Sequence, residues 1–313
     1  MEQTIPVVDL RAYRDPATRD SFIQQYGDAL KELGFVAIEG YGIDQDLFER
    51  TYAAYRTFFA LPDEVKRQYE HPETGRRRGY TSFGVEHAKD NTQPDLKEFF
   101  HVGREASKSD PMFERLPKNV WPAEVEAVKQ TSLELYEALD RVAFECLEAL
   151  GIYLGTEPSF LVDMARGGNT LQRVIHYPVC DGFDKPGAMR AAQHEDINLM
   201  TLLPPADQSG LELLTREGKW LPIRAIPGQI IADTGDMMMR ITNDTIPATT
   251  HRVVNPQGDP TARYSMPFFV HPHLDAMLEV LPSCLEDGET PKYAPINNEE
   301  FLMERLRAIG LTK

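Results

Sequence analysis

The segment AAQHEDINLMTLLPP, from Ala191 to Pro205, places a histidine and two acidic residues directly before an apolar run. The apolar part is typical of a buried β-strand. Because residues i and i+2 of a strand point to the same face, we expect His194 and Asp196 to converge on one point while Glu195 faces outward. In a chain with 8 His and 49 acidic residues, such a pair is also expected by chance. Its meaning therefore depends on what the rest of the chain supplies.

A third metal ligand is available in the later segment ATTHRVVN, which contains His251. At one strand per ~8–12 residues, about five strands lie between Asp196 and His251, which can bring their strands side by side in an eight-stranded roll. Two imidazoles and one carboxylate on one side of a metal leave three positions open, as Fe(II) oxygenases require for a co-substrate and O₂. A structural zinc site would need a fourth ligand, commonly cysteine, and none is near in sequence. His271 and His273 are an alternative pair of ligands, but nothing nearby completes a facial set.

Two further segments carry side chains suited to binding a carboxylate. In ARYSMPFFV, Arg263 and Ser265 share one face of a predicted strand, and a guanidinium with a hydroxyl is a good clamp for a carboxylate. In RVIHYP, Tyr177 is placed to donate its hydroxyl to the same co-substrate. Arg173 lies on the same face and, if it points inward, favours an anionic or carboxylate-bearing substrate. His176 falls on the opposite face, where we expect a satisfied core or interface histidine.

The order of elements predicts a mainly β fold with flanking helices, built on a double-stranded β-helix or jelly roll. We assign this core to residues 121–313, in which short β-rich runs such as MMMRIT and RYSMPFFVH follow one another from about residue 168. Residues 1–120 form a mixed α/β region that packs on the core. An apolar stripe predicts a scaffold helix over 122–151 with Gly151 at its end, and a further helix ends the chain. We expect Met237 to Arg240, Phe268 and Phe269 in the core.

Composition narrows the range of partners. The 313 residues include 33 basic and 49 acidic side chains, a net charge of −16, which disfavours nucleic acid and anionic membranes as partners. Cys146, Cys180 and Cys284 form neither a disulfide framework nor a zinc signature, and we find no signal peptide or membrane span. We therefore expect a cytoplasmic protein. Arg76 to Arg78 form a basic cluster, interpreted as a solvated loop in preference to a substrate anchor.

Taken in order, these motifs resemble the 2-oxoglutarate and Fe(II)-dependent dioxygenases of the isopenicillin N synthase-like group. The N-terminal region is similar in IPVVDL, LKELGFVAIEGYGI, FFALPDEVKRQY, GYTSFGVE, DLKEFFHVG and NVWP, and the catalytic roll in HYP, HEDINLMTLL, HRV and RYSMPFFV. The resemblance implies that the catalytic iron ligands are His194, Asp196 and His251. It also implies that 2-oxoglutarate is bound by Arg263, Ser265 and Tyr177.

The resemblance implies an oxidoreductase that uses Fe(II), 2-oxoglutarate and O₂ to hydroxylate or desaturate a small molecule, with succinate and CO₂ as co-products. Many members have an asparagine where Ile175 stands, so one contact to 2-oxoglutarate is missing. An alternative is therefore an isopenicillin N synthase-like oxidase that uses O₂ without 2-oxoglutarate on a carboxylate-bearing peptide or amino acid. A second alternative is a non-catalytic jelly-roll binding module. Substrate identity and oligomeric state stay open.

Overall fold

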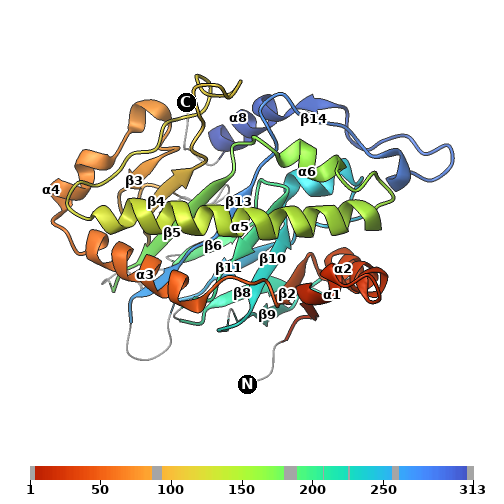
Figure 1. The fold of residues 1–313 in the computed structure, drawn as a ribbon, viewed down its shortest axis with the longest axis horizontal. Coiled ribbons are helices and arrows are strands. Elements are labelled where there is room, and N and C mark those ends of the chain that lie inside the picture. Colours follow the sequence, from red (N-terminus) through yellow and green to blue (C-terminus); the bar gives the residue numbers. More distant parts are fainter. Residues whose placement is uncertain are drawn as a thin grey trace.

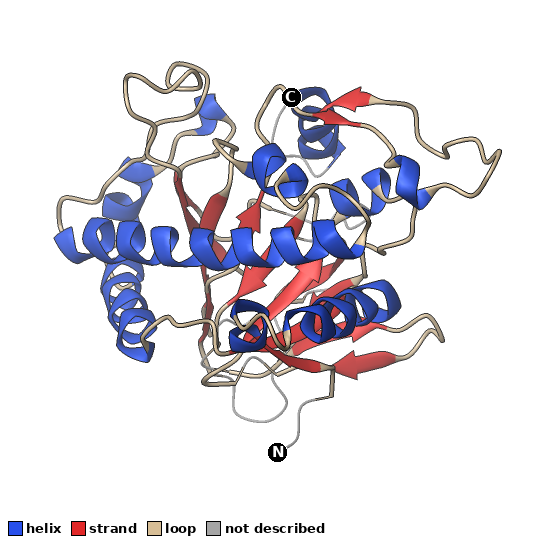
Figure 2. Cartoon of the chain, turned by 45° about the vertical axis from the view of Figure 1, so that its right-hand side comes forward, coloured by secondary structure: helices blue, strands red, loops and turns tan. Residues whose placement is uncertain are grey.

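In the described residues, two large β-sheets and a small two-stranded ribbon are combined with a layer of helices (Figures 1 and 2). The structure, a computed structural model, describes residues 4–86, 94–179, 189–206, 208–224, 226–255 and 261–308. The larger sheet has nine strands in the order β1-β2-β10-β7-β13-β5-β4-β3, with β12 also paired to β5, and the smaller sheet has the order β6-β11-β8-β9. This is the mainly β architecture with flanking helices that the sequence predicts.

The strands of the larger sheet come from both ends of the chain. They are β1 (Val7–Asp9), β2 (Phe35–Glu39), β3 (Gly79–Thr81), β4 (Glu98–Gly103), β5 (Leu171–Tyr177), β7 (Met200–Leu203), β10 (Ile230–Thr234), β12 (Arg263–Ser265) and β13 (Phe268–Val270). Since β2 pairs with β10 and β4 pairs with β5, the N-terminal region extends the sheet of the roll at both edges. The smaller sheet consists of β6 (Ala191–His194), β8 (Leu211–Leu214), β9 (Trp220–Pro222) and β11 (His251–Val253), and a separate ribbon consists of β14 (Met277–Leu278) and β15 (Ile296–Asn297).

Apolar side chains fill the spaces on both faces of the larger sheet. One buried cluster joins the two sheets, with Phe35 and Ile231 from the larger and Leu213 and Val253 from the smaller. A second cluster joins the larger sheet to the helices and includes Phe268 of β13. The alternation of strand side chains explains both clusters, because successive residues point to opposite faces.

Helix α5 (Glu126–Tyr153) crosses the outer face of the larger sheet (Figure 1). Tyr136 of this helix packs edge-on against Phe268 at 4.9 Å between ring centroids. The predicted end at Gly151 is wrong, because Gly151 is buried inside the helix and Tyr153 continues it. The ring of Tyr153 lies so close to Gly27 that a Cβ there would be 2.1 Å from it, and this packing holds the last turn in place.

The other helices are α1 (Leu10–Arg14), α2 (Arg19–Leu33), α3 (Gln45–Phe59), α4 (Asp63–Lys66), α6 (Phe160–Ala165), α7 (Asp236–Ile241) and α8 (Asn298–Ala308). Three short 3₁₀ helices are η1 (Arg67–Tyr69), η2 (Pro72–Thr74) and η3 (Pro282–Cys284). Helix α2 is capped by Gly34, whose left-handed φ of 66° favours glycine. A Cβ at Gly34 would be 2.4 Å from Thr249 Oγ1. The glycine thus lets α2 approach the segment that leads into β11.

Two expectations about the roll need correction. MMMRIT is not a strand but belongs to α7, consistent with the good helix propensity of methionine and the absence of β-branched residues before Ile241. Phe268 is fully buried in the core, whereas Phe269 points the other way and lines a cavity. Alternation along β13 separates the two phenylalanines.

The thiols of Cys146 and Cys284 are free, and Cys180 lies outside the described residues. Among the helices in the described ranges, none is both long and apolar enough to cross a membrane. The cytoplasmic location stays a prediction.

Candidate active site

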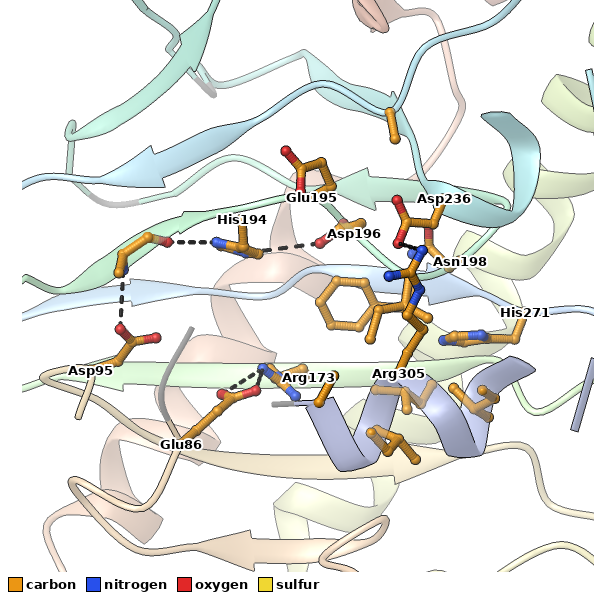
Figure 3. A pocket seen from close by; sticks show the side chains of 18 of the residues that line it. Glu86, Asp95, Arg173, His194, Glu195, Asp196, Asn198, Asp236, His271 and Arg305 are labelled. Carbon is orange, nitrogen blue, oxygen red and sulfur yellow. Dashed lines mark hydrogen bonds and ion pairs between the residues drawn. The ribbon is translucent and has the colours of Figure 1, made fainter. Parts of the chain in front are cut away.

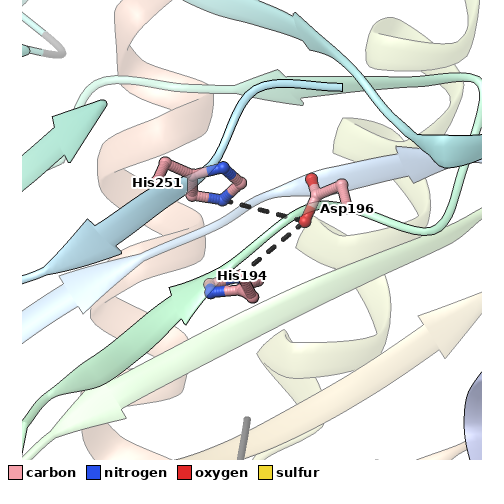
Figure 4. A group of neighbouring side chains, drawn as sticks. All are labelled: His194, Asp196 and His251. Atoms are coloured by element: carbon pink, nitrogen blue, oxygen red, sulfur yellow. Dashed lines mark ion pairs between the residues drawn. The ribbon is translucent and has the colours of Figure 1, made fainter. Parts of the chain in front are cut away.

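Three side chains from separate segments converge on one point of the smaller sheet (Figure 4). His194 ends β6 and His251 begins β11, and the antiparallel register places these two residues directly opposite each other. Asp196 Oδ1 lies 3.9 Å from His194 Nε2 and 3.8 Å from His251 Nε2. One potential ligand atom from each of the three residues lies within 4.8 Å of the others. The structure therefore brings together the three ligands predicted from the sequence.

Hydrogen bonds on the far side of each imidazole set its orientation. His194 Nδ1 is 2.7 Å from the Ala192 carbonyl, and His251 Nδ1 is 3.1 Å from the Thr249 carbonyl. A carbonyl only accepts, so each Nδ1 carries the proton and each Nε2 presents a lone pair. Burial, with the neighbouring His194, lowers the pKa of His251, which keeps this imidazole neutral and able to bind a metal.

Asp196 is held from the opposite side. Its Oδ2 accepts a hydrogen bond from the hydroxyl of Thr201, which in turn accepts one from Asn198 Nδ2 at 2.8 Å. The backbone amide of Asp236 donates to the Asp196 carbonyl at 2.7 Å. The expectation that Asp196 shares a strand with His194 is wrong, because β6 ends at His194 and Asp196 lies in the loop that follows. The loop, and not strand alternation, turns the carboxylate toward the imidazoles.

The predicted carboxylate clamp is also assembled. Arg263 and Ser265 on β12 pair with Tyr177 and Ile175 on β5. Arg263 Nη1 donates to Ser265 Oγ at 3.1 Å, and the guanidinium carbon lies 5.1 Å from the centroid of the Tyr177 ring. Arg263 is 2% exposed and its Nε donates to the Gln208 carbonyl at 3.4 Å, but among the described residues it pairs with no carboxylate. A buried cation in this state fits an incoming carboxylate, because an unpaired buried charge is unfavourable.

A cavity of about 810 Å³ opens next to His194 and Asp196 (Figure 3). Arg173 lies in its wall, as predicted, but its charge is already matched. Its Nη1 donates to Glu86 at 3.0 Å, and its Nε donates to His101 Nε2 at 2.7 Å. Lys97 lies 3.1 Å from the same Glu86 carboxylate. Arg173 is therefore a positioned hydrogen-bond donor in a balanced network and not an isolated cation.

Several cavity residues were not predicted from the sequence. Arg305 of α8 lines the same cavity as Arg173 and forms an ion pair with Asp236 at 3.2 Å (Figure 3). Met239 of α7 lines the same space, which corrects its assignment to the core. The solvated loop expected for Arg76 to Arg78 is also wrong: Arg78 is 1% exposed, and Arg77 lines the cavity. These residues have no short motif, so sequence patterns offered no signal for them.

The structure also places the other histidines considered in the sequence analysis, His176, His271 and His273. His176 is satisfied, as predicted, with Nδ1 2.7 Å from Glu98 Oε1 and its ring stacked on Tyr264. His271 lines the cavity outside the metal cluster, and its Nδ1 has no partner among the described residues. Burial lowers the pKa of His271 to about 4. In the described ranges, His271 and His273 do not form a second metal cluster.

Comparisons with known proteins identify the family. Residues 5–124 match the model "non-haem dioxygenase in morphine synthesis N-terminal", and residues 168–272 match "2OG-Fe(II) oxygenase superfamily". The chain is 32% identical over 308 residues to the 2-oxoglutarate-Fe(II) type oxidoreductase hxnY of Emericella nidulans, covering 95% of this chain and 88% of the relative. The chain belongs to the 2OG-Fe(II) oxygenase superfamily.

Two solved structures are similar over nearly the whole chain. A Caulobacter crescentus protein assigned to the 2OG-Fe(II) oxygenase family has a TM-score of 0.88 and 37% identity, covering 98% of this chain and 100% of that one. A full-length Neurospora crassa protein, solved in complex with alpha-KG and thymine, has a TM-score of 0.85 and 27% identity, covering 97% and 96%. These matches confirm the jelly-roll fold class predicted from the sequence.

The protein is thus a 2-oxoglutarate-dependent Fe(II) dioxygenase that acts on a small molecule with Fe(II), 2-oxoglutarate and O₂. The predicted enzyme class and cofactors are confirmed. The relatives favour this activity over the oxidase without 2-oxoglutarate and over the binding module.

Proposed function

We propose that His194, Asp196 and His251 hold the Fe(II). The observation that carries this proposal is the convergence of two Nε2 lone pairs and one carboxylate oxygen within 4.8 Å. This donor set suits Fe(II) and leaves coordination positions open for reactants. The ion, when bound, supplies the site at which O₂ is activated to oxidise a C–H bond, and the residues around it position the reactants and exclude water.

We propose that Arg263, Ser265 and Tyr177 bind the 5-carboxylate of 2-oxoglutarate. The support is the buried Arg263 guanidinium, whose contacts in the described residues are to the Gln208 carbonyl and the Ser265 hydroxyl and not to a carboxylate. Ser265 Oγ already lies beside it and adds a second donor. Strand β5 carries Tyr177 in this clamp and Arg173 in the cavity wall, so one element links the cosubstrate clamp to the substrate cavity.

The primary substrate, in this proposal, is a small polar molecule in the cavity of about 810 Å³. Arg173 contacts it through Nη2, which has no protein partner in the described part of the chain. Because Glu86 neutralises Arg173, this contact selects a hydrogen-bond acceptor such as a carbonyl and not net negative charge. The similar Neurospora crassa protein was solved with thymine, a small molecule with two carbonyl groups, and this supports a substrate of similar size.

Succinate release from 2-oxoglutarate by the Fe(II)-loaded protein tests the proposal, together with anaerobic calorimetry of 2-oxoglutarate binding. We expect His194→Ala to abolish both metal retention and turnover, and Arg263→Gln to weaken 2-oxoglutarate binding with the metal retained. The control is His71→Gln, at a surface histidine that contacts Glu73, which should change neither. Iron-loaded protein that neither binds 2-oxoglutarate nor forms succinate would contradict the proposal.

A further inference from the structure

Three consecutive arginines, Arg76 to Arg78, occupy three different environments. The Arg76 side chain turns to Glu70, with Nε 2.8 Å from Oε1. Arg78 is buried and donates from Nη2 to Asn169 Oδ1 at 3.0 Å. Arg77, between them, lines the active-site cavity. Of the three, Arg77 therefore lines the cavity without a carboxylate partner in the described residues.

The backbone around Arg77 is held on both sides. Gly75 and Arg76 both have left-handed φ angles, 69° and 53°, which make a tight turn after η2. The Arg76 carbonyl accepts from His101 Nδ1 at 3.0 Å, and the Arg77 carbonyl accepts from Arg78 Nη1 at 2.7 Å. A side chain that leaves a fixed loop loses less entropy when it binds a ligand.

Arg77 lacks the carboxylate partner that each of the other basic side chains lining the cavity has in the described residues. Each of those has a carboxylate partner: Arg76 with Glu70 (2.8 Å), Lys97 with Asp95 (2.8 Å), Arg173 with Glu86 (3.0 Å) and Arg305 with Asp236 (3.2 Å). Arg77 donates only from Nε, to the Thr74 carbonyl at 3.1 Å, and pairs with no carboxylate in the described ranges. In the described part of the chain neither Nη group has a hydrogen-bond partner, so both can bind a ligand.

Glu299, the acidic residue whose charge acts on Arg77, already has a partner of its own. Partial burial lowers the pKa of Arg77, and the charge of Glu299 acts in the opposite direction. Glu299, however, accepts a hydrogen bond from Arg115 Nη2 at 2.9 Å. A half-buried guanidinium without a counter-charge favours an anion from outside the chain.

We propose that Arg77 binds a carboxylate of the primary substrate, which makes the substrate class a small carboxylic acid. This inference rests on the proposed function, in which the cavity holds that substrate. The planar guanidinium can bind a carboxylate through two parallel hydrogen bonds. Leu302 and Leu306 of α8 line the same cavity and suit an apolar part of such an acid.

The test compares acids with their uncharged amides on the protein loaded with Mn(II) and saturated with 2-oxoglutarate, so that 2-oxoglutarate already occupies the clamp and its own positions on the metal. A probe that binds the remaining position on the metal would keep its acid preference in Arg77→Gln. Calorimetry measures benzoate against benzamide, phenylacetate against phenylacetamide, and hexanoate against hexanamide. We expect the protein to bind at least one acid about tenfold or more tightly than its amide, or about 1.4 kcal/mol. Arg77→Gln should reduce this preference to within about twofold, and Arg77→Lys should retain part of it.

Arg76→Gln is the matched control, since it makes the same change one residue away at an arginine already paired with Glu70, and it should keep the acid preference. Either of two results would overturn the proposal that Arg77 binds the substrate carboxylate. In the first, the unmodified protein binds no acid better than its amide; in the second, the acid preference survives Arg77→Gln. Failure to bind 2-oxoglutarate at the outset would instead count against the proposed function, so the two failures are distinguishable.

Discussion

Replacement of Thr201 by valine tests whether the metal site depends on side chains outside the three ligands. Thr201 lies on β7, is 3% exposed, and donates its hydroxyl hydrogen bond to Asp196 Oδ2. The same hydroxyl accepts from Asn198 Nδ2 at 2.8 Å, so its single proton is directed to the carboxylate. Asp196 Oδ1 is thereby left facing the two imidazoles. Valine keeps the shape of the side chain and removes this restraint.

Two independent energy scales predict the same loss of Fe(II) affinity in Thr201→Val. A hydrogen bond to a charged group contributes about 1.5–3 kcal/mol. Replacing the hydrogen-bond partner of a metal ligand typically costs about 10–100-fold in metal affinity, or about 1.4–2.7 kcal/mol. We therefore expect Thr201→Val to weaken Fe(II) binding by about 10–100-fold. The unpaired amide of buried Asn198 should also lower the free energy of unfolding, by about 1–3 kcal/mol.

Anaerobic titration of the metal-free protein with Fe(II) measures the affinity, and urea unfolding of the same preparation measures the stability. Thr201→Ser is the matched control, because it restores the hydroxyl without the methyl group and should bind Fe(II) within about threefold of the unmodified protein. Unchanged Fe(II) affinity in a folded Thr201→Val variant would refute the reasoning, since Asp196 would then be oriented without its hydroxyl partner.

Three further changes probe the rest of the site. Arg263→Gln should raise the dissociation constant of 2-oxoglutarate by about 10–100-fold in calorimetry, because one charged donor is lost, and an unchanged constant would remove Arg263 from the clamp. Glu86→Gln leaves buried Arg173 and Lys97 with one carboxylate fewer and should lower the free energy of unfolding in urea by about 3–5 kcal/mol, whereas a loss below about 1 kcal/mol would mean that the network does not stabilise the fold. Burial lowers the pKa of His271 to about 4, below the ~6.5 of the unfolded chain, so its contribution to stability is complete above pH 6.5 and decreases as the pH falls toward 4. Metal-free His271→Asn should therefore lose about 2 kcal/mol less than the unmodified protein between pH 7 and pH 5, and equal losses would show that His271 is not the group responsible.

The proximity of the two histidines in the proposed metal site could be predicted because both lie on strands. Histidines 194 and 251 lie on β6 and β11, five strands apart in sequence order, and these strands are neighbours in the smaller sheet. The proximity of Arg263 and Ser265, which we propose bind 2-oxoglutarate, was predictable for the same reason, because the two residues lie on one face of a strand. Local periodicity is sufficient where all the residues of a group lie on regular strands.

The cavity wall could not be predicted in this way, because its charges are set by contacts between distant loops. From β5 alone, Arg173 indicates an anion site, but Glu86 arrives from another segment and neutralises it. The sequence of Arg76 to Arg78 indicates one solvated cluster, yet their three side chains take different directions from a turn with two left-handed residues. Ion pairing depends on tertiary partners, and no pattern within a loop encodes them.

The break in β6 after His194 is required by the geometry of the metal site. His194 and His251 are directly opposite on antiparallel strands, so their side chains start within about 5.5 Å of each other. If β6 continued beyond His194, Asp196 would lie two residues further along the strand. It would then be displaced by about 6.6 Å from the pair of histidines, away from both imidazoles. Instead, the chain leaves the sheet at Glu195, and Asp196 Oδ1 lies at nearly equal distances, 3.9 and 3.8 Å, from the two Nε2 atoms. The spacing of two residues therefore predicted that these side chains converge, but for an incomplete reason. The histidines are placed by sheet register, and the carboxylate is placed by a loop that the Thr201 hydroxyl and the Asp236 amide hold from behind.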